Sequence, residues 1–329
     1  MKMYDDKYIV VTGGAGFIGS GVVRYLNDMH MDKNIVIVDD LKNSTKWKNL
    51  VGKRFQDIVS KHELFNWLKG RESEIEAFIH LGACSDTTEL DAGYLLSNNY
   101  HYTVRLAEYA LKHGHRFIYA SSAATYGAGE NGFSDEHSVI ESLKPINMYA
   151  YSKQLFDIWL LENGLLDRVV GLKYFNIFGP NEQHKGKMMS VVPKFVETIQ
   201  RDGMIKLFKS SDPKNFADGE QQRDFLYVKD AVRMTCEFLE SDASGIYNVG
   251  SGITTTWNKL ASTIFKILNK KEVIEYVDMP KELIGAYQNY TCAKMDKIIS
   301  VNGIDSSSMS IEDSVEDYIK GYILKGNRW

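Results

Sequence analysis

The chain alternates short apolar runs with longer amphipathic stretches from residue 8 onward. The apolar runs are rich in β-branched and aromatic residues and have no polar alternation, which is typical of strands covered on both faces. They lie at residues 8–11, 35–38, 77–80, 117–120 and 169–172, with helical patterns between them at 17–29, 98–113 and 149–162. Repeated βαβ units of this kind predict a Rossmann-type, doubly wound parallel sheet, an α/β fold.

The regular alternation of predicted strands and helices ends after about residue 180. Residues 181–188 and 209–222 are polar and rich in turn-forming residues, and 225–240 predict a strand followed by a helix that begins at Asp230, a favourable N-cap residue. The remaining segments mix short helices and strands. We therefore predict two domains. They are a dinucleotide-binding domain of residues 1–176 and 218–250, and a smaller, partly interleaved α/β substrate-binding cap of residues 177–217 and 251–329.

Composition narrows the class of protein. The 329 residues carry a net charge of −4 with both signs scattered, so no basic face indicates a nucleic-acid partner, and a small-molecule ligand is expected. Three cysteines without C-x-x-C spacing indicate neither a disulfide framework nor a metal site. No apolar run approaches the roughly 18 residues of a membrane span, and we expect a cytoplasmic protein without membrane attachment.

A glycine-rich loop follows the first predicted strand and opens the first predicted helix. It reads Gly14-x-Gly16-x-x-Gly19, and also Gly13-x-x-Gly16-x-x-Gly19. Glycine is needed there for a tight turn, for close approach of the backbone to a pyrophosphate, and for close packing of helix on strand. The order of strand, loop and helix predicts a dinucleotide site.

Acidic residues end the second predicted strand about 20 residues beyond the last glycine, where a ribose-binding acid belongs. Asp39 would accept hydrogen bonds from the adenosine ribose, which favours NAD. Lys42 and Lys46 would instead pair with a 2′-phosphate, which favours NADP. The residues alone leave the choice open.

The ends of the later predicted strands carry small, hydroxyl and amide side chains. These segments are residues 81–85, 121–127 and 174–180. In an open parallel sheet, ligands bind beyond the carboxyl ends of the strands, so these segments are a plausible lining for a dinucleotide and a polyol. Cys84 has no histidine near it in sequence, and a small buried filler is its expected role.

Tyr149 and Lys153 are four residues apart on a predicted helix and therefore share one face, whereas Tyr151 points elsewhere. An ammonium group near a phenol favours the phenolate, and we expect it to lower the tyrosine pKa toward neutral pH. The phenolate would then take a hydroxyl proton as hydride leaves the same carbon, with Ser122 holding the hydroxyl in line.

Three motifs together resemble the extended short-chain dehydrogenase/reductase superfamily, which includes nucleotide-sugar epimerases and dehydratases. They are the glycine loop from Thr12, the set of Ser122 with Tyr149-x-x-x-Lys153, and "RDFLYVKDA" from Arg223 to Ala231. The resemblance implies that Arg223 approaches a sugar-nucleotide diphosphate. Dehydratases of the superfamily carry an Asp-Glu pair just after the active-site Ser or Thr, and residues 123–125 here are Ala-Ala-Thr. Dehydration is therefore disfavoured.

Four further stretches resemble the family of ADP-heptose 6-epimerases: "LGACSDTTELD", "YASSAATYG", "YFNIFGPNEQHKGKMMSVV" and "IGAYQNYT". The resemblance implies epimerisation at C6″ of an ADP-heptose for the lipopolysaccharide inner core. The carbon is transiently oxidised to a ketone and hydride returns to the opposite face. The implied cofactor is NADP, with NAD as the alternative, and the implied assembly is a homo-oligomer, a pentamer in the family. Lys185 matches the family's second acid/base, beside Tyr149.

The same resemblance carries over further positions. Those matching cofactor contacts are Gly13, Gly16, Phe17, Ile18, Gly19, Asp39, Asp40, Lys46, Leu81, Gly82, Ala83, Cys84, Ser85, Asn98, Lys153 and Ile177. Those matching substrate contacts are Asn176, Lys187, Lys194, Phe208, Lys209, Ser210, Ser211, Arg223 and Tyr287.

Several positions depart from the family's pattern. The family often has Asn at Asp40, usually has Ser and His at Lys187 and Lys194, and Arg at Ala286; residues 213–221 also form a longer insertion than expected. The extra charge of Asp40 weakens the NADP assignment, whereas added lysines suit a diphosphate. Two other functions stay open. One is another nucleotide-sugar epimerase or reductase, such as a UDP-sugar 4-epimerase, and the other is a non-catalytic dinucleotide-binding protein.

Overall fold

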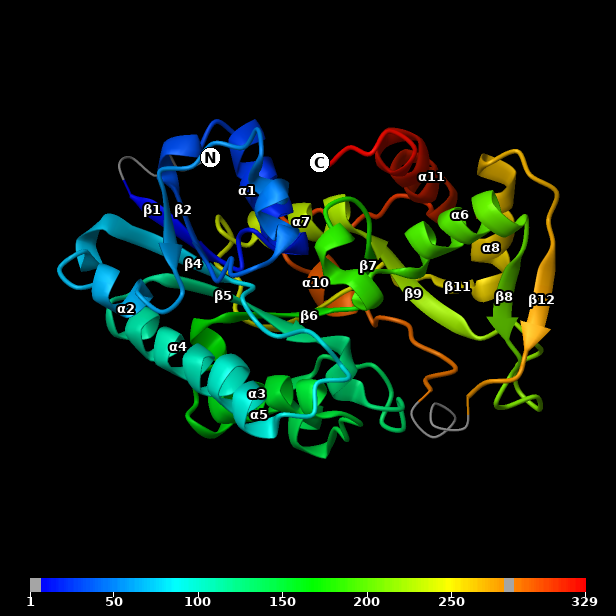
Figure 1. Cartoon of the computed structure of the whole chain (residues 1–329). Helices are drawn as coiled ribbons and strands as arrows, with labels where there is room; N and C mark the ends of the chain where they lie inside the picture. Colours follow the sequence, from blue (N-terminus) through cyan, green and yellow to red (C-terminus); the bar gives the residue numbers. More distant parts are fainter. Residues whose placement is uncertain (1–6, 281–286) are drawn as a thin grey trace.

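The computed structural model describes residues 7–280 and 287–329. Within these residues a seven-stranded, all-parallel sheet forms the left half of the molecule in Figure 1. Its strand order is β10-β6-β5-β4-β1-β2-β3, which confirms the predicted Rossmann-type fold. The strands are β1 (Tyr8–Thr12), β2 (Ile35–Asp39), β3 (Asp57–Ser60), β4 (Ile75–His80), β5 (Arg116–Ser122), β6 (Val170–Tyr174) and β10 (Gly245–Val249).

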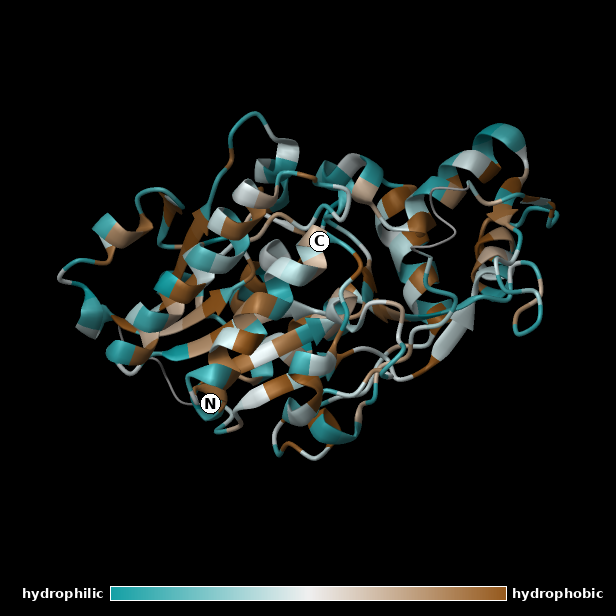
Figure 2. Ribbon diagram, turned by 90° about the horizontal axis from the view of Figure 1, so that it is seen from below, coloured by the Kyte–Doolittle hydropathy of each residue, from teal (hydrophilic) through white to brown (hydrophobic). Residues whose placement is uncertain are grey.

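Helices cover both faces of this sheet, which explains the unbroken apolar strands. Alternate residues of β1 point to opposite sides, so that Ile9 and Val11 belong to one core cluster and Val10 to the other. Helices α1 (Phe17–Asp28) and α7 (Val228–Glu237) pack against each other over the first cluster, and α4 (Tyr102–Lys112) and α5 (Met148–Glu162) cover the second. Figure 2 shows the apolar strands enclosed between these layers.

The five strands predicted from apolar runs are confirmed, as is the strand predicted before the helix near residue 230, which is β9 (Gln222–Tyr227). β3 and β10 were not predicted. β3 is an edge strand in which Val59 alone is buried, so its sequence lacks the apolar run that marks the others. The helix predicted at 98–113 is divided into a π-helical segment, η4 (Leu96–His101), and α4. It is preceded by α3 (Ala92–Leu95).

The prediction that a helix begins at Asp230 was wrong. α7 begins two residues earlier, at Val228, directly after β9 and without a side-chain cap. Asp230 lies in the first turn, where its carboxylate accepts hydrogen bonds from the Met309 amide at 2.9 Å and from Arg233 at 3.4 Å. The Met309 amide, far away in sequence, and Arg233, one helical turn along, together account for the acid at this position.

The described residues also form two small sheets on the right of Figure 1. In one sheet β9 pairs with β7 in parallel and with β11 antiparallel, and in the other β8 pairs with β12. β9 thus lies outside the large sheet, although the next two elements belong to the large-sheet half: α7 packs over that sheet and β10 is one of its strands. The domain boundaries stay a prediction. The remaining elements here include β7 (Asn176–Phe178), β8 (Ile205–Phe208), β9 (Gln222–Tyr227), β11 (Thr254–Thr256), β12 (Ile274–Val277), α6 (Val191–Asp202), α8 (Trp257–Ile267), α10 (Asp296–Ile299), α11 (Ile311–Glu316) and the π-helical η9 (Asp317–Ile323).

Three further observations concern features considered from composition. Cys84, Cys236 and Cys292 are all free thiols. Among the described residues, no group of three or more His, Cys, Asp or Glu side chains is arranged to hold a metal ion. No helix in residues 7–280 and 287–329 has the length and apolar character needed to cross a membrane.

Candidate active site

The glycine loop packs directly on the end of β4. Gly13 has a φ of +68°, and a Cβ added to it would lie 2.8 Å from the Cα of Gly82. At Gly19 an added Cβ would lie 2.2 Å from the Gly13 carbonyl oxygen, so only glycine lets α1 start this close to the loop. The Gly82 amide donates to the Thr12 hydroxyl at 3.1 Å. The predicted segment 81–85 therefore adjoins the loop, and the arrangement fits a dinucleotide pyrophosphate.

Asp39 orders the glycine loop. Its carboxylate is 8% exposed and accepts hydrogen bonds from the Ala15 amide at 2.9 Å and the Asp40 amide at 2.6 Å, and it forms a 2.5 Å ion pair with Lys46. Asp40 lies 3.1 Å from the Lys42 ammonium and 3.7 Å from that of Lys61. Burial acts to raise the pKa of Asp40, but the hydrogen bond and charge of Lys42, with the charge of Lys61, lower it.

Asn98 and its neighbour Asn99 connect this region to α5, the helix that carries Tyr149 and Lys153. The Asn98 side chain accepts from Lys61 at 2.7 Å and donates to Asn99 at 2.9 Å. Asn99 is 1% exposed. Its side chain accepts a hydrogen bond from the Cys84 amide and donates one to the Cys84 carbonyl, each at 2.9 Å. It also donates to the Ser152 hydroxyl at 3.1 Å. Sequence reasoning missed Asn99, because its partners Cys84 and Ser152 lie in two other segments of the chain.

Tyr149 lies at the start of α5, which Asn147 caps by accepting from the Ala150 amide at 2.8 Å. Burial raises the pKa of Tyr149, and a hydrogen bond with Ser122 acts to lower it. The structure thus brings Ser122, at the end of β5, to the Tyr149 hydroxyl. Cys84 is half-buried rather than the buried filler that we expected, and burial raises the pKa of its thiol. Tyr151 is 44% exposed and points away, as predicted.

Lys153 is buried beneath this pair. It is 5% exposed, and its ammonium donates to the Ala120 carbonyl on β5 at 2.7 Å. Burial lowers the pKa of Lys153 to about 8, and the charge of Asp157 opposes the shift. The expectation that Lys153 lowers the Tyr149 pKa does not hold for the protein alone. Burial of the phenol outweighs the opposing effects, and the ammonium is bound to a carbonyl on β5.

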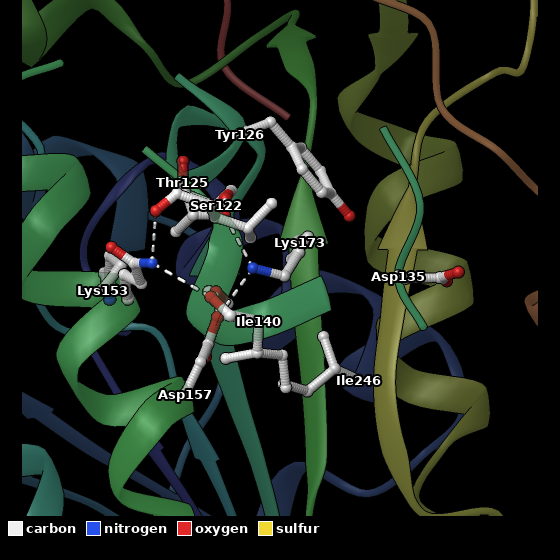
Figure 3. Close-up of polar contacts among 12 residues, drawn as sticks. Ser122, Thr125, Tyr126, Asp135, Ile140, Lys153, Asp157, Lys173 and Ile246 are labelled. Carbon is white, nitrogen blue, oxygen red and sulfur yellow. Dashed lines mark hydrogen bonds and ion pairs between the residues drawn. The ribbon is translucent and has the colours of Figure 1, made fainter. Parts of the chain in front are cut away.

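A buried ionic network holds α5 against the sheet (Figure 3). Lys173 on β6 donates to Asp157 at 2.7 Å and to the Thr125 hydroxyl at 2.6 Å. Asp157 on α5 also accepts from the Tyr119 and Ser121 hydroxyls of β5, both at 2.8 Å. Every oxygen of the carboxylate is therefore hydrogen-bonded, and the helix that carries Tyr149 and Lys153 is fixed to both β5 and β6.

Lys185 lies in a 3₁₀ loop, η8 (Gln183–Met188), with Gly186 in the left-handed region at φ +53°. Its ammonium is 5.1 Å from the centre of the Phe17 ring, at the first residue of α1. Burial lowers the pKa of Lys185; the charge of Glu182 raises it, and that of Lys194 lowers it further. Lys194 in turn donates to the Lys187 carbonyl at 2.7 Å, so these three lysines lie on one loop-and-helix unit.

The strand order separates Lys185 from Tyr149. Lys185 contacts the segment that follows β1, Tyr149 contacts the end of β5, and β4 lies between these strands. Two strand spacings correspond to about 10 Å. The residues that Lys185 and Tyr149 contact thus follow strands on either side of β4, at the carboxyl ends of the sheet, and residues 81–85 follow β4 itself.

The predicted substrate residues gather around β9. Arg223 is 7% exposed, and its guanidinium lies 5.0 Å from the Tyr287 ring centre and 5.7 Å from that of Trp257. Trp257, which sequence reasoning missed, donates to the Tyr287 hydroxyl at 2.8 Å. Burial lowers the pKa of Arg223, and Tyr287 opposes the shift.

The other predicted substrate positions lie on β7, on β8 and in the segment that follows β8. Asn176 donates to the Asp224 carbonyl at 3.1 Å, and the Ser211 hydroxyl bonds to Asn289 at 3.2 Å. Phe208 ends β8. Ile177, which was predicted as a cofactor contact, lies in β7. Lys209 forms an ion pair with Asp278 at 2.9 Å, and the Ser210 amide donates a hydrogen bond to the Asp218 carboxylate at 2.8 Å. Ala286 lies outside the described residues.

Known proteins match both the sequence and this arrangement. Residues 9–250 match the model of the NAD dependent epimerase/dehydratase family. The ADP-L-glycero-D-manno-heptose-6-epimerase of Nitratidesulfovibrio vulgaris (strain DP4) is 46% identical over 317 residues, which cover 95% of this chain and 97% of that protein.

Two solved structures are similar over nearly the whole chain. The ADP-L-glycero-D-manno-heptose-6-epimerase of Helicobacter pylori has a TM-score of 0.79 at 27% identity, covering 98% of this chain and 99% of that one. The UDP-N-acetylglucosamine 4-epimerase of Methanobrevibacter ruminantium M1 has a TM-score of 0.79 at 26% identity, covering 97% and 99%. The fold, the glycine loop and these likenesses show that the chain belongs to the NAD dependent epimerase/dehydratase family.

Proposed function

We propose that this protein interconverts the C6″ epimers of ADP-glycero-D-manno-heptose. The observation that carries the proposal is the pair Tyr149 and Lys185, on opposite flanks of one sheet edge. Inversion of a carbon needs a proton exchanged at two positions, and one residue serves only one of them. The relative that is 46% identical bears the name of this activity.

The residues of the glycine loop, Asp39 and segment 81–85 would hold the dinucleotide. The bound nicotinamide supplies the capacity to take up and return a hydride. Removal of the C6″ hydroxyl proton with the hydride leaves a ketone on the sugar. Return of the hydride to the other face of the ketone carbon, with a proton added to the ketone oxygen, gives the second epimer, so atoms and electrons balance over the cycle.

The surroundings of Tyr149 and Lys185 favour different roles, one as proton donor and the other as proton acceptor. Burial raises the pKa of Tyr149, which favours the phenol as a proton donor, and lowers the pKa of Lys185, which favours the amine as a proton acceptor. Ser122, hydrogen-bonded to Tyr149, would orient the substrate oxygen. Lys153, on the same face of α5, would stabilise the phenolate form of Tyr149 through its charge. The direction in which each group acts reverses when the reaction runs backward.

For the cofactor we propose NADP. Support comes from the cations around Asp39 and Asp40, where Lys42, Lys46 and Lys61 outnumber the two carboxylates. Lys46 is 20% exposed and already lies at the acid that would face the ribose, which suits a 2′-phosphate. NAD is the alternative, since Asp39 alone would bind ribose hydroxyls.

For the substrate, the cationic groups on β9 and the Lys185 loop support a nucleoside diphosphate. Arg223 would contact the diphosphate, with Lys187 and Lys194 adding charge, and Asn176 and the segment Phe208–Ser211 would contact the rest of the ligand. The resemblance also supports lipopolysaccharide inner-core precursor synthesis in the cytoplasm by a homo-oligomer. Residues 177–217 and 251–329 would act as the substrate-binding part of each subunit.

The decisive experiment incubates the purified protein with ADP-D-glycero-D-manno-heptose and resolves the C6″ epimers by chromatography. We expect conversion to an equilibrium mixture without added oxidant, and no conversion by cofactor-loaded protein would refute the proposal. The UDP-sugar 4-epimerase alternative, supported by the Methanobrevibacter ruminantium structure, predicts conversion of UDP-N-acetylglucosamine in the same assay.

A further inference from the structure

Two consecutive residues at the base of the Lys185 loop are completely buried. Asn181 and Glu182 are both 0% exposed and immediately precede η8. Asn181 has a φ of +78°, in the left-handed region that non-glycine residues rarely adopt. A buried polar pair in this conformation persists only where the surrounding contacts hold it. Those contacts come from parts of the chain far away in sequence.

Glu182 ties both ends of the loop to η9. Its carboxylate accepts hydrogen bonds from the Ser190 amide at 2.5 Å and the Ser190 hydroxyl at 2.6 Å. Ser190 closes the loop at the residue before α6. The same carboxylate accepts from the Tyr318 hydroxyl at 3.0 Å. The two ends of the loop that carries Lys185 thus meet at one buried acid.

Asn181 ties the loop to α1 and to Trp329. Its side-chain oxygen accepts from the Trp329 amide at 2.9 Å, and its amide group donates to the Trp329 carbonyl oxygen and the Ser20 hydroxyl at 3.0 and 3.1 Å. The Trp329 ring lies against Gly21 of α1, where an added Cβ would be 2.7 Å from a ring carbon. Figure 1 shows this end of the chain returning from α11 toward α1.

Asn49 joins the Lys185 loop to the glycine loop. It is 1% exposed, and its amide group donates to the Ala15 carbonyl at 3.1 Å and the Asn181 carbonyl at 3.0 Å. Its side-chain oxygen accepts from the Arg328 guanidinium at 2.9 Å. Lys53 adds a hydrogen bond from the same segment to the Trp329 carbonyl oxygen. Arg328 therefore contacts Asn49 and Trp329 contacts Asn181, the two residues whose hydrogen bond joins the loops.

We infer that the segment Arg328–Trp329 is a positioning element that holds the Lys185 loop against the glycine loop. The inference rests on the proposed function for the role of Lys185, but the anchoring itself does not depend on the substrate. Trp329 contacts no reacting group. It acts through Asn181, whose backbone leads directly into the loop, and through its packing on the helix that follows the glycine loop.

The anchoring is tested by limited trypsin digestion, because the loop contains Lys185 and Lys187. We expect Trp329→Ala to speed cleavage after these lysines about tenfold, because it removes the ring that packs on Gly21 of α1 while the backbone groups of residue 329 that bond to Asn181 remain. Arg328→Met should act in the same direction, and Trp329→Phe should restore protection. Leu324→Ala, at a 50% exposed position of the neighbouring segment, is the control and should leave cleavage unchanged. Equal cleavage in wild type and Trp329→Ala would overturn the inference.

The consequence for catalysis is tested by single-turnover oxidation of each C6″ epimer, followed by nicotinamide absorbance. Trp329→Ala should slow the epimer that Lys185→Met slows and leave the other within about twofold, whereas a general folding defect would slow both. Equal slowing of both epimers would overturn the positioning role. If wild type oxidises neither epimer but Trp329→Ala still exposes the loop, the proposed function fails and the anchoring stands.

Discussion

Lys173 and Asp157 form a 2.7 Å ion pair in which the two side chains are only 1% and 0% exposed. Their remaining polar atoms are hydrogen-bonded to Thr125, Tyr119 and Ser121. The pair joins α5 to β5 and β6. It therefore sets where Tyr149 and Lys153 stand relative to the strand ends, although it touches neither ligand site.

Removing one partner of this pair should be costly. Lys173→Met leaves Asp157 charged and buried without its cation, and we expect the free energy of unfolding to fall by roughly 3–5 kcal/mol. Urea unfolding at neutral pH measures it. The matched control is Lys144→Met, which breaks an ion pair with Glu130 whose side chains are 74% and 61% exposed, and should change stability by less than about 1 kcal/mol. Equal effects of both substitutions would contradict the interpretation of the network.

Tyr149→Phe should lower kcat about a hundredfold or more, since the phenol can no longer exchange a proton with the substrate. Cofactor content should stay at the wild-type level, because the glycine loop is untouched. Tyr151→Phe, at a 44% exposed position on the same helix, is the control and should keep full activity. Activity and released nicotinamide measured on the same preparations decide the result, and an unchanged rate for Tyr149→Phe would refute the assigned role.

Lys185→Met should abolish epimerisation while one epimer is still oxidised in a single turnover through Tyr149. The reason is that removal of one proton-transfer group leaves only one face of the ketone served. Epimer exchange and nicotinamide absorbance distinguish the two events. Lys206→Met, at a 61% exposed lysine of β8, should behave as wild type. Normal epimerisation by Lys185→Met would show that another group performs the second transfer.

Cofactor choice should depend on Lys46. We expect Lys46→Ala to weaken NADP binding about tenfold or more, because a charge-assisted contact to the 2′-phosphate is lost, and to change NAD binding far less. Titration calorimetry with both dinucleotides measures the ratio. The exposed Lys48, two residues along, provides the control in Lys48→Ala. Equal losses for the two dinucleotides would favour a structural role in the Asp39 pair.

Stability should fall in acid because of His80. This side chain is fully buried between the Thr12 and Thr103 hydroxyls, at 2.6 and 2.8 Å, and burial lowers its pKa from 6.5 to about 3. The unfolded chain therefore binds more protons between these pH values. The contribution is fully present above about pH 6.5 and is lost as the pH falls, by roughly 3–5 kcal/mol at the lower end.

The His80 effect is isolated by comparing urea unfolding at pH 7.5 and pH 5 for wild type and His80→Gln. The variant should be less stable at both pH values but should show a smaller difference between them, since glutamine does not titrate. His184, whose pKa burial lowers to about 4, contributes in the same sense to both proteins. An identical pH dependence in both would exclude His80 as its source.

Much of the nucleotide-binding half could be predicted from the sequence because its signals are local. Strands such as β1 and β6 are buried on both faces and must be apolar throughout, and the glycine loop follows from backbone contacts as close as that of Gly13 with Gly82. The spacing of Tyr149 and Lys153 on one helix face is likewise a local property. The structure brings Ser122 to Tyr149 as the motif indicated.

The groups that could not be predicted act through partners far away in sequence. Asn99 bonds to residues of two other segments, and Trp257 becomes part of the Arg223 environment only after α8 packs beside β9. The raised pKa of Tyr149 is of the same kind, because desolvation depends on the whole surrounding fold. No pattern in a short window of sequence encodes such contacts.

The path of the chain between the large and small sheets limits how such a protein can be re-engineered. The chain leaves the large sheet after β6 for β7, returns after β9 through α7 to β10, and leaves again for β11. Exchanging the substrate-side elements between relatives would need junctions at each of these passages to remain in register at once. Changes of specificity are therefore more accessible through single loops, such as residues 208–211, than through recombination of whole domains.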